Sequence, residues 1–135
     1  MKIDIGKLID EWSILKLKVE RIGDKYSQEK IKEYEEVIVT LKEKHPNIDW
    51  GQFQSILVSI NSYIWQLEAG LKGEKEHLPN PDYLFDEHNN SVLRKFGLTV
   101  LIIRNFNNLR VQIKNIINSL IGESYQDIRK DHLNN

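Results

Sequence analysis

Seven side chains in the middle and late parts of the sequence carry the chemical groups that recognise a small anionic molecule. They fall on two predicted helices at steps of three or four residues, which place each set on one helix flank. Arginine and lysine bind phosphates and carboxylates, amides bind hydroxyl groups, and an indole packs on a base or a sugar ring. The pattern fits a pocket for an anionic metabolite such as a nucleotide or a phosphorylated sugar. The seven residues are Asn61, Trp65, Glu68, Asn107, Arg110, Lys114 and Asn118.

The same side chains can instead form a buried network that fixes how two helices pack. Glu68 is the only charged residue between Trp50 and Leu71, whereas residues 91–121 carry five basic side chains and no acidic one. A buried carboxylate needs a cationic or hydrogen-bonding partner. We therefore predict that Glu68 pairs with Arg110 and Lys114. This structural interpretation is favoured over the ligand pocket, which stays open as the alternative.

Most signatures of catalysis and metal binding are missing from the chain. The absence of cysteine excludes disulfides, a thiol nucleophile and thiolate zinc sites. No glycine-rich phosphate loop and no GxSxG motif occurs. The spacing Glu-x-x-His occurs at Glu74 and His77, whereas di-iron bundles need it on two helices. We expect no metal, no cofactor and no catalytic residue, and the sequence favours a protein that is not an enzyme.

The composition is that of one soluble globular domain covering residues 1–135. Hydrophobic residues make up 40% of the chain and charged residues 29%, with a net charge of −1. No third of the sequence is basic enough to predict a nucleic-acid partner. No stretch approaches the roughly 20 apolar residues that span a bilayer, and the start of the chain lacks the apolar segment of a signal peptide. We expect a cytoplasmic protein with no membrane partner.

Hydrophobic spacing predicts four helices. Asp4 is a suitable N-cap for the first helix, and Gly23 lies where that helix is expected to stop. Pro46 ends the second, and Gly122 is expected to end the fourth. No segment alternates apolar and polar residues between hairpin turns, so we expect no sheet. The helices are expected over residues 5–22, 27–45, 50–71 and 91–121.

These elements predict an all-α protein, a four-helix bundle or a close variant of one. Residues 73–89 contain two prolines and are expected to form a long connection between the third and fourth helices. The residues after Gly122 are expected to form a short C-terminal helix. In the fourth helix, one apolar line at helical spacing is the predicted core face. That line is Ile102, Phe106, Leu109, Ile113, Ile116 and Leu120.

Three helical blocks resemble a family of small all-helical bacterial proteins of unknown function. In that family's pattern an Asp-x-x-Ser-Ile-Leu motif opens the first helix, here between Asp10 and Leu15. The other two motifs contain the seven residues named above. The resemblance implies an all-helical fold and the same residue set, and it implies no activity. The blocks cover residues 8–22, 61–72 and 107–123.

Two classes of function follow from these observations. The first is a helical interaction or structural module that associates with itself, because its apolar helix surface exceeds what one short bundle needs to hide. The run LTVLII at residues 98–103 is part of that surface. A two-fold homodimer is the commonest outcome of such association and is our expectation. The second class is a binding domain, with or without enzymatic activity, for a small anionic metabolite.

Overall fold

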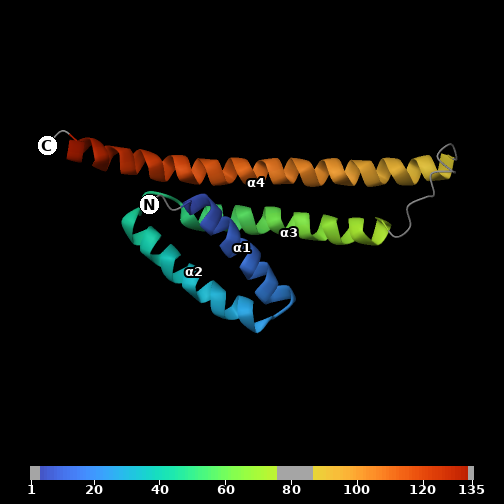
Figure 1. The fold of residues 1–135 in the computed structure, drawn as a ribbon, viewed down its shortest axis with the longest axis horizontal. Helices are drawn as coiled ribbons and strands as arrows, with labels where there is room; N and C mark the ends of the chain where they lie inside the picture. Colours follow the sequence, from blue (N-terminus) through green and yellow to red (C-terminus); the bar gives the residue numbers. More distant parts are fainter. Residues whose placement is uncertain (1–3, 76–86, 134–135) are drawn as a thin grey trace. The chain divides into compact units, whose positions relative to one another are not determined.

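The computed structural model describes the backbone of residues 4–75 and 87–133 and the side chains of residues 4–73 and 91–122. This part of the chain forms four α-helices and no strand, so the predicted all-α class is confirmed. Figure 1 shows the helices coloured in chain order. They are α1 (Ile5–Arg21), α2 (Lys25–Lys44), α3 (Trp50–Lys75) and α4 (Glu87–Leu133).

The chain divides into two compact units. The first unit comprises Met1–Asn61 together with Arg110–Asn135, and the second comprises Ser62–Leu109. Both α3 and α4 therefore contribute to both units, the first unit taking the start of α3 and the later part of α4.

The ends of α1 follow the predicted signals. The Asp4 carboxylate accepts a hydrogen bond from the Lys7 amide at 2.9 Å, which satisfies one of the free N–H groups of the first turn. Gly23 has a φ of 69°, a left-handed conformation that costs glycine little, and its amide donates to the Lys18 carbonyl. Asp24 then caps α2, which begins two residues earlier than predicted and ends before Pro46.

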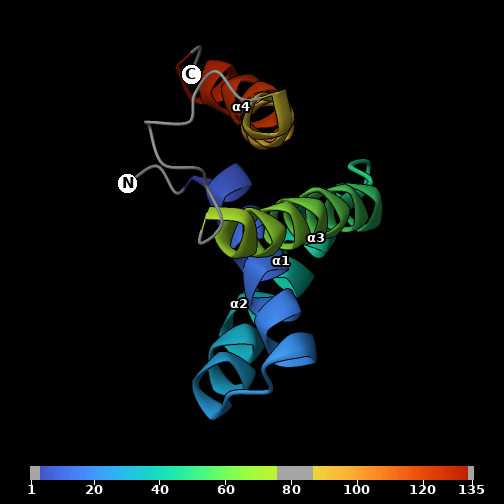
Figure 2. The ribbon, with the colours of Figure 1, turned by 90° about the vertical axis from the view of Figure 1, so that its right-hand side faces the viewer.

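Helices α1 and α2 form an antiparallel hairpin within the first unit, with the two helices side by side in both views (Figures 1 and 2). The Tyr34 hydroxyl of α2 donates to the Glu11 carboxylate of α1 at 2.7 Å. This hydrogen bond to a carboxylate, together with partial burial, raises the pKa of Tyr34 to about 12. The contact joins the polar edges of the hairpin, while its apolar side faces the core.

The predicted ends of the two long helices are wrong. Helix α3 continues through Gly70 and Gly73 to Lys75, and α4 begins at Glu87, before residue 91. Helix α4 also continues through Gly122 to Leu133, so the separate short C-terminal helix is replaced by one continuous helix. The physical reason is the same at all three glycines. One glycine lowers helix stability by about 1 kcal/mol relative to alanine and ends a helix only where the chain also turns.

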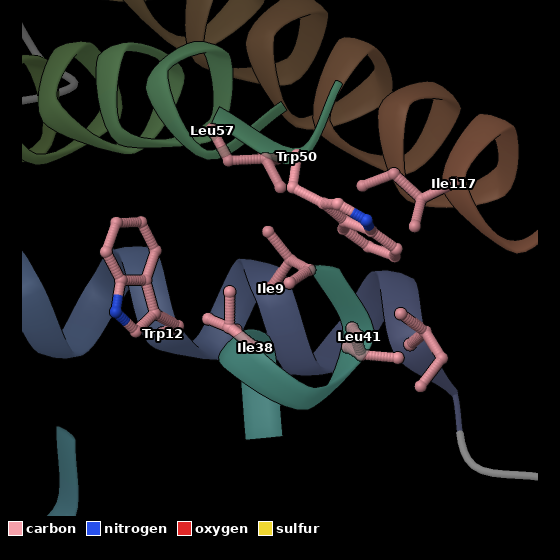
Figure 3. Packing of buried hydrophobic residues seen from close by; sticks show 8 residues of the cluster. Ile9, Trp12, Ile38, Leu41, Trp50, Leu57 and Ile117 are labelled. Atoms are coloured by element: carbon pink, nitrogen blue, oxygen red, sulfur yellow. The ribbon is translucent and has the colours of Figure 1, made fainter. Parts of the chain in front are cut away.

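The core of the first unit draws on all four helices. Figure 3 shows the side chains of this cluster meeting between α1, α2, the start of α3 and the later part of α4. Ile9, Leu57 and Ile117 are fully buried at its centre. Burying side chains of this size stabilises a fold by about 1.5 to 3 kcal/mol each. The labelled members are Ile9, Trp12, Ile38, Leu41, Trp50, Leu57 and Ile117.

The predicted core line of α4 is wrong at three of its six residues. Ile102, Leu109 and Ile116 have 37%, 41% and 47% of their surface exposed, whereas Ile113 of the same line packs against the core. Ile117, which the prediction left out, is fully buried. Helix α4 has apolar residues on two faces, and periodicity alone cannot say which of them is inside.

Some predictions fall on residues outside the described part. The side chains of Glu74 and His77 belong to this group, and so do residues 76–86 of the predicted long connection. Within the described helices, none is long and apolar enough to cross a membrane.

Candidate functional site

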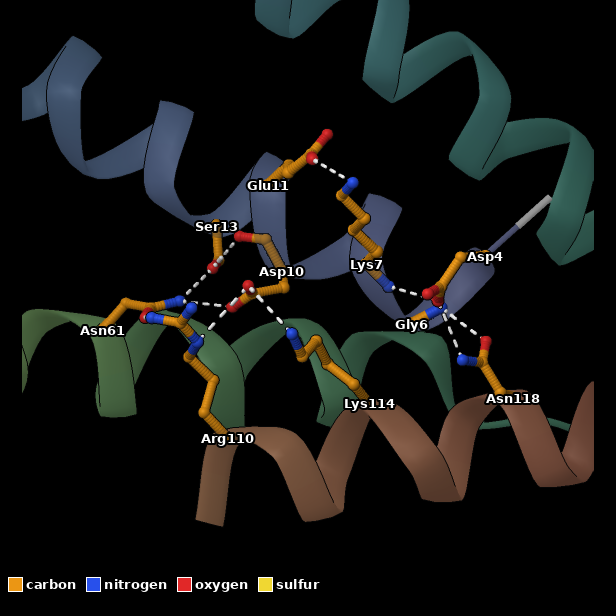
Figure 4. A network of polar contacts seen from close by, with 10 residues as sticks. All are labelled: Asp4, Gly6, Lys7, Asp10, Glu11, Ser13, Asn61, Arg110, Lys114 and Asn118. Carbon is orange, nitrogen blue, oxygen red and sulfur yellow. Dashed lines mark hydrogen bonds and ion pairs between the residues drawn. The ribbon is translucent and has the colours of Figure 1, made fainter. Parts of the chain in front are cut away.

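A buried carboxylate on α1, that of Asp10, is the centre of a polar network in the first unit (Figure 4). Asn61 of α3 donates from Nδ2 to Asp10 Oδ1 at 2.9 Å, and the same Nδ2 donates to Ser13 Oγ at 2.6 Å. The Ser13 hydroxyl in turn donates to the Asp10 carbonyl oxygen at 2.6 Å. Asp10, Ser13 and Asn61 are each at most 5% exposed. Three buried polar side chains thus satisfy one another, as burial requires.

Two cations of α4 supply the opposite charge. Arg110 Nε lies 3.4 Å and Lys114 Nζ lies 4.0 Å from Asp10 Oδ2. Arg110 also donates from Nη1 to Asn61 Oδ1 at 3.4 Å. Charge-assisted hydrogen bonds usually measure about 2.7 to 2.9 Å, so these ion pairs are loose. The cations are a quarter exposed and Asp10 is buried, which places the pair at the border between core and solvent.

Helical spacing explains why these side chains meet. Asp10 and Ser13 are three residues apart on α1, and Arg110 and Lys114 are four apart on α4, so each pair lies on one side of its helix. Asn61 stands on α3 beside Ile60, which is buried. The apolar core of the unit brings the three helices together, and the network then fixes their register.

A second polar contact joins α4 to the first turn of α1. The Asn118 amide accepts at Oδ1 from the Gly6 amide and donates from Nδ2 to Asp4 Oδ1, both at 2.8 Å. The hydrogen bond from Asn118, with that from the Lys7 amide, lowers the pKa of Asp4. Asn118 therefore acts as an added cap for α1, supplied by a helix more than a hundred residues later.

This contact depends on a glycine. Gly6 is buried, and a Cβ atom built on it would overlap the carbonyl group of Lys114 and lie 2.9 Å from Lys114 Cα. Both obstacles are backbone atoms, which cannot move without shifting α4. The absence of a side chain at position 6 thus allows α1 and α4 to approach closely enough for Asn118 to reach the helix end.

We predict that Asn118→Ala raises the pKa of Asp4 towards the ordinary value of an aspartate, because its largest cause of lowering is removed. A group whose pKa is lowered by folding stabilises the fold above its unfolded pKa and loses that contribution as the pH falls through the folded pKa. The variant should therefore lose less stability than the parent protein as the pH falls through the pKa of Asp4. An NMR titration of the carboxyl carbons measures the shift directly.

Asp24 is the internal control for this titration. Its pKa is lowered by hydrogen bonds from the side chain and the backbone of Ser27, within its own cap. The Asp24 titration should be the same in both proteins. Equal shifts at Asp4 and Asp24 would mean that the substitution acts through general unfolding instead.

Four of the seven predicted site residues take part in these contacts, and they belong to the first unit. Trp65 and Asn107 are half-buried and Glu68 is exposed, and these three belong to the second unit. The prediction that Glu68 is the carboxylate partner of Arg110 and Lys114 is corrected, because the structure places Asp10 beside both cations. The four residues in the contacts are Asn61, Arg110, Lys114 and Asn118.

The prediction missed the residues that α1 contributes. Asp10 lies between Ile9 and Trp12 in the sequence, and both of these residues are buried. An acidic residue among buried neighbours needs a partner of opposite charge or a hydrogen-bond donor. The Asp-x-x-Ser motif identified Asp10 and Ser13 as part of the family pattern, but their contacts with Asn61 and the cations of α4 were not predicted. Gly6 gave no signal, because a close approach of two backbones cannot be read from one sequence.

The arrangement has the chemistry of a structural network. Asp10 is already hydrogen-bonded and paired, and the Ser13 hydroxyl beside it donates its proton to the Asp10 carbonyl oxygen. Two hollows of about 460 and 500 Å³ open on the first unit, and neither is lined by Asp10, Arg110 or Lys114. Within the described residues, no three histidine, aspartate or glutamate side chains gather into a group that can hold a metal ion.

The comparisons give no relative from which a role could be transferred. The chain matches no model of a protein family, no curated protein and no solved structure.

Proposed function

We propose that this protein is a helical interaction module that associates with itself through an exposed face of α4. One observation carries the proposal. Four large apolar side chains of α4 in the second unit, between positions 98 and 109, are 37–59% exposed. Together with Asn105 between them, we call these residues the outer stripe. Its apolar members are Leu98, Leu101, Ile102 and Leu109.

The outer stripe is not the inner face of α4. At about 100° per residue, Phe96 and Ile103 point away from it and Phe106 lies at its border, and all three are half-buried. The Phe106 ring stacks on Tyr63 of α3, with centroids 5.5 Å apart and planes 11° apart. Helix α4 therefore has an occupied apolar face and a second apolar face in water. Contiguous exposed apolar surface of this kind marks interaction sites.

The polar network fits this role as a support. A buried set of paired charges and amides contributes little net stability but defines one way of packing. In the first unit it fixes the later part of α4 against α1 and α3. Within the first unit, this defined packing is the structural role that the proposal gives to the network.

A second candidate function is the binding of a small anionic metabolite at Arg110 and Lys114. It is favoured by the charge of the network, since two cations share one carboxylate at 3.4 and 4.0 Å, and Arg110 Nε has no hydrogen-bond partner within the described residues. Binding of inorganic phosphate in calorimetry, lost in Arg110→Met, would support this candidate over a purely structural network.

Sedimentation velocity tests the first proposal. We expect the full chain at micromolar concentration to have about twice its monomer mass of 15.9 kDa. Ile102→Glu places a charge in the outer stripe and should weaken association at least about tenfold, the equivalent of 1.4 kcal/mol. Circular dichroism checks that the variant is still helical.

Val100→Glu is the matched control for that experiment. Val100 is 42% exposed on the same helix, but it lies far around the helix from the stripe. It should leave the dissociation constant unchanged. A monomer at high concentration, or equal effects of the two substitutions, would contradict self-association through this face. The cytoplasm remains our proposed location for the protein.

A further inference from the structure

The outer stripe has the spacing of a coiled-coil seam. Leu98, Ile102, Asn105 and Leu109 follow steps of four, three and four residues, which assigns Ile102 and Leu109 to a positions and Leu98 and Asn105 to d positions of a heptad. All four are exposed. This alternation is what keeps one narrow line of a helix facing a second helix along its length.

The stripe and its borders carry no charge. From position 98 to position 109 the residues at a, d, e and g positions are leucine, isoleucine, threonine, phenylalanine or asparagine. Arg104 is the one charged residue in this range and lies far from the stripe, at a c position. Within residues 98–109, two copies of α4 can therefore approach along the stripe without opposing like charges, although Lys95 holds the preceding a position and the helix as a whole is basic. A seam of this kind suits a second copy of itself.

Asn105 adds a stronger argument for a second copy. An amide carries both a donor and an acceptor, so it can form hydrogen bonds with the same amide of another copy. A lysine or a glutamate in the seam would instead repel its counterpart. An amide within an apolar seam lowers stability but selects the register in which it is paired.

The pairing of Asn105 also selects the relative orientation of the two α4 helices, parallel or antiparallel. In a parallel pair each residue faces its own counterpart, so Asn105 meets Asn105 of the second copy. In an antiparallel pair that buries all four positions, Leu98 lies opposite Leu109 and Ile102 lies opposite Asn105, which leaves each amide against an apolar side chain. Unpaired buried amides cost about 1 to 3 kcal/mol. Isoleucine at an a position with leucine at a d position also favours two parallel strands.

We infer that two copies of this chain pair in parallel and in register through the outer stripe of α4, with Asn105 of each copy hydrogen-bonded to the other. This inference rests on the proposed function and adds the orientation, the register and the residue that selects them. Asn105 is a specificity-determining residue in this arrangement, because it disfavours the antiparallel pair.

The absence of cysteine makes disulfide mapping unambiguous, since each variant has one thiol. Leu98→Cys is expected to form a cross-linked dimer under mild oxidation, because in-register d positions bring the two Cα atoms within the 4.4–6.8 Å that a disulfide spans. A mixture of Leu98→Cys with a size-tagged Leu109→Cys should give few mixed dimers. Adding Asn105→Leu to both chains should raise the share of mixed dimers, because the cost of the antiparallel pair is removed.

Val100→Cys is the control for chance collisions, since Val100 is also exposed but lies off the stripe. Mixed dimers of the Leu98→Cys and Leu109→Cys chains as the main product would overturn the parallel orientation. A chain that sediments as a dimer but cross-links no better through Leu98→Cys than through Val100→Cys would overturn the seam while leaving self-association intact. A chain that sediments as a monomer would overturn the proposed function itself.

Discussion

Asp10→Ala is expected to lower the free energy of unfolding by about 3 kcal/mol, because it leaves Arg110 and Lys114 without the carboxylate that they share. Breaking one partner of a fully buried ion pair costs about 3 to 5 kcal/mol. We expect the lower end of that range, since water reaches a quarter of each cationic side chain. Urea unfolding followed by circular dichroism measures the change.

The double variant Asp10→Ala with Arg110→Met separates the lost ion pair from lost packing. Replacing the arginine by an apolar side chain removes a cation that the first substitution left without its carboxylate. Part of the lost free energy of unfolding should therefore be recovered. Glu68→Ala is the control, because Glu68 is an exposed carboxylate and should change stability by no more than about 0.5 kcal/mol. A loss at Glu68 as large as that at Asp10 would contradict the network described here.

Gly6→Ala is the second substitution with a large expected effect. Alanine favours helix over glycine by about 1 kcal/mol, so a solvent-exposed helix would gain stability from this change. Here the new methyl group meets the Lys114 backbone, and overpacking of this kind costs about 1 to 3 kcal/mol and sometimes more. We expect a net loss of about 2 kcal/mol in thermal or urea unfolding, accompanied by loss of the Asn118 contact.

Gly70→Ala is the matched control for Gly6→Ala. Gly70 is also inside a helix, but a Cβ atom there meets nothing within 4 Å. The same substitution should therefore raise stability by up to about 1 kcal/mol. Opposite signs at the two glycines are the expected result, and a gain at Gly6 would show that α1 and α4 do not approach closely there.

Local signals predicted the elements well, and they failed where the outcome depends on distant residues. The Asp4 cap, the Gly23 stop and the proline after α2 act within one or two turns, so the sequence shows both partners of each contact. The ends of α3 and α4 depend on whether the chain turns at a glycine, which nearby residues do not decide. The choice between the two apolar faces of α4 depends on which face α1 and α3 cover.

The candidate site was predicted in part for the same reason. The spacing of Arg110, Lys114 and Asn118 showed that they share a flank of α4, and the lack of acidic residues on that helix showed that they need a partner. The partner itself came from α1, roughly a hundred positions earlier. Glu68 was a reasonable choice on the neighbouring helix in the sequence, but no pattern within one sequence measures which of two carboxylates is nearer in space.

The Gly6–Asn118 contact links positions 112 residues apart, and this separation has a consequence for folding during synthesis. The α1–α2 hairpin forms from local contacts and can appear as soon as its residues leave the ribosome. Its apolar side, with Ile9 at the centre, stays uncovered until Ile117 of α4 is made, 73 residues after the end of α2. At about 5 to 20 residues per second, this takes roughly 4 to 15 seconds. During that interval the nascent chain exposes the apolar side of the hairpin, which is the kind of surface that chaperones bind. The same surface favours misassembly between chains that are being made on one messenger RNA.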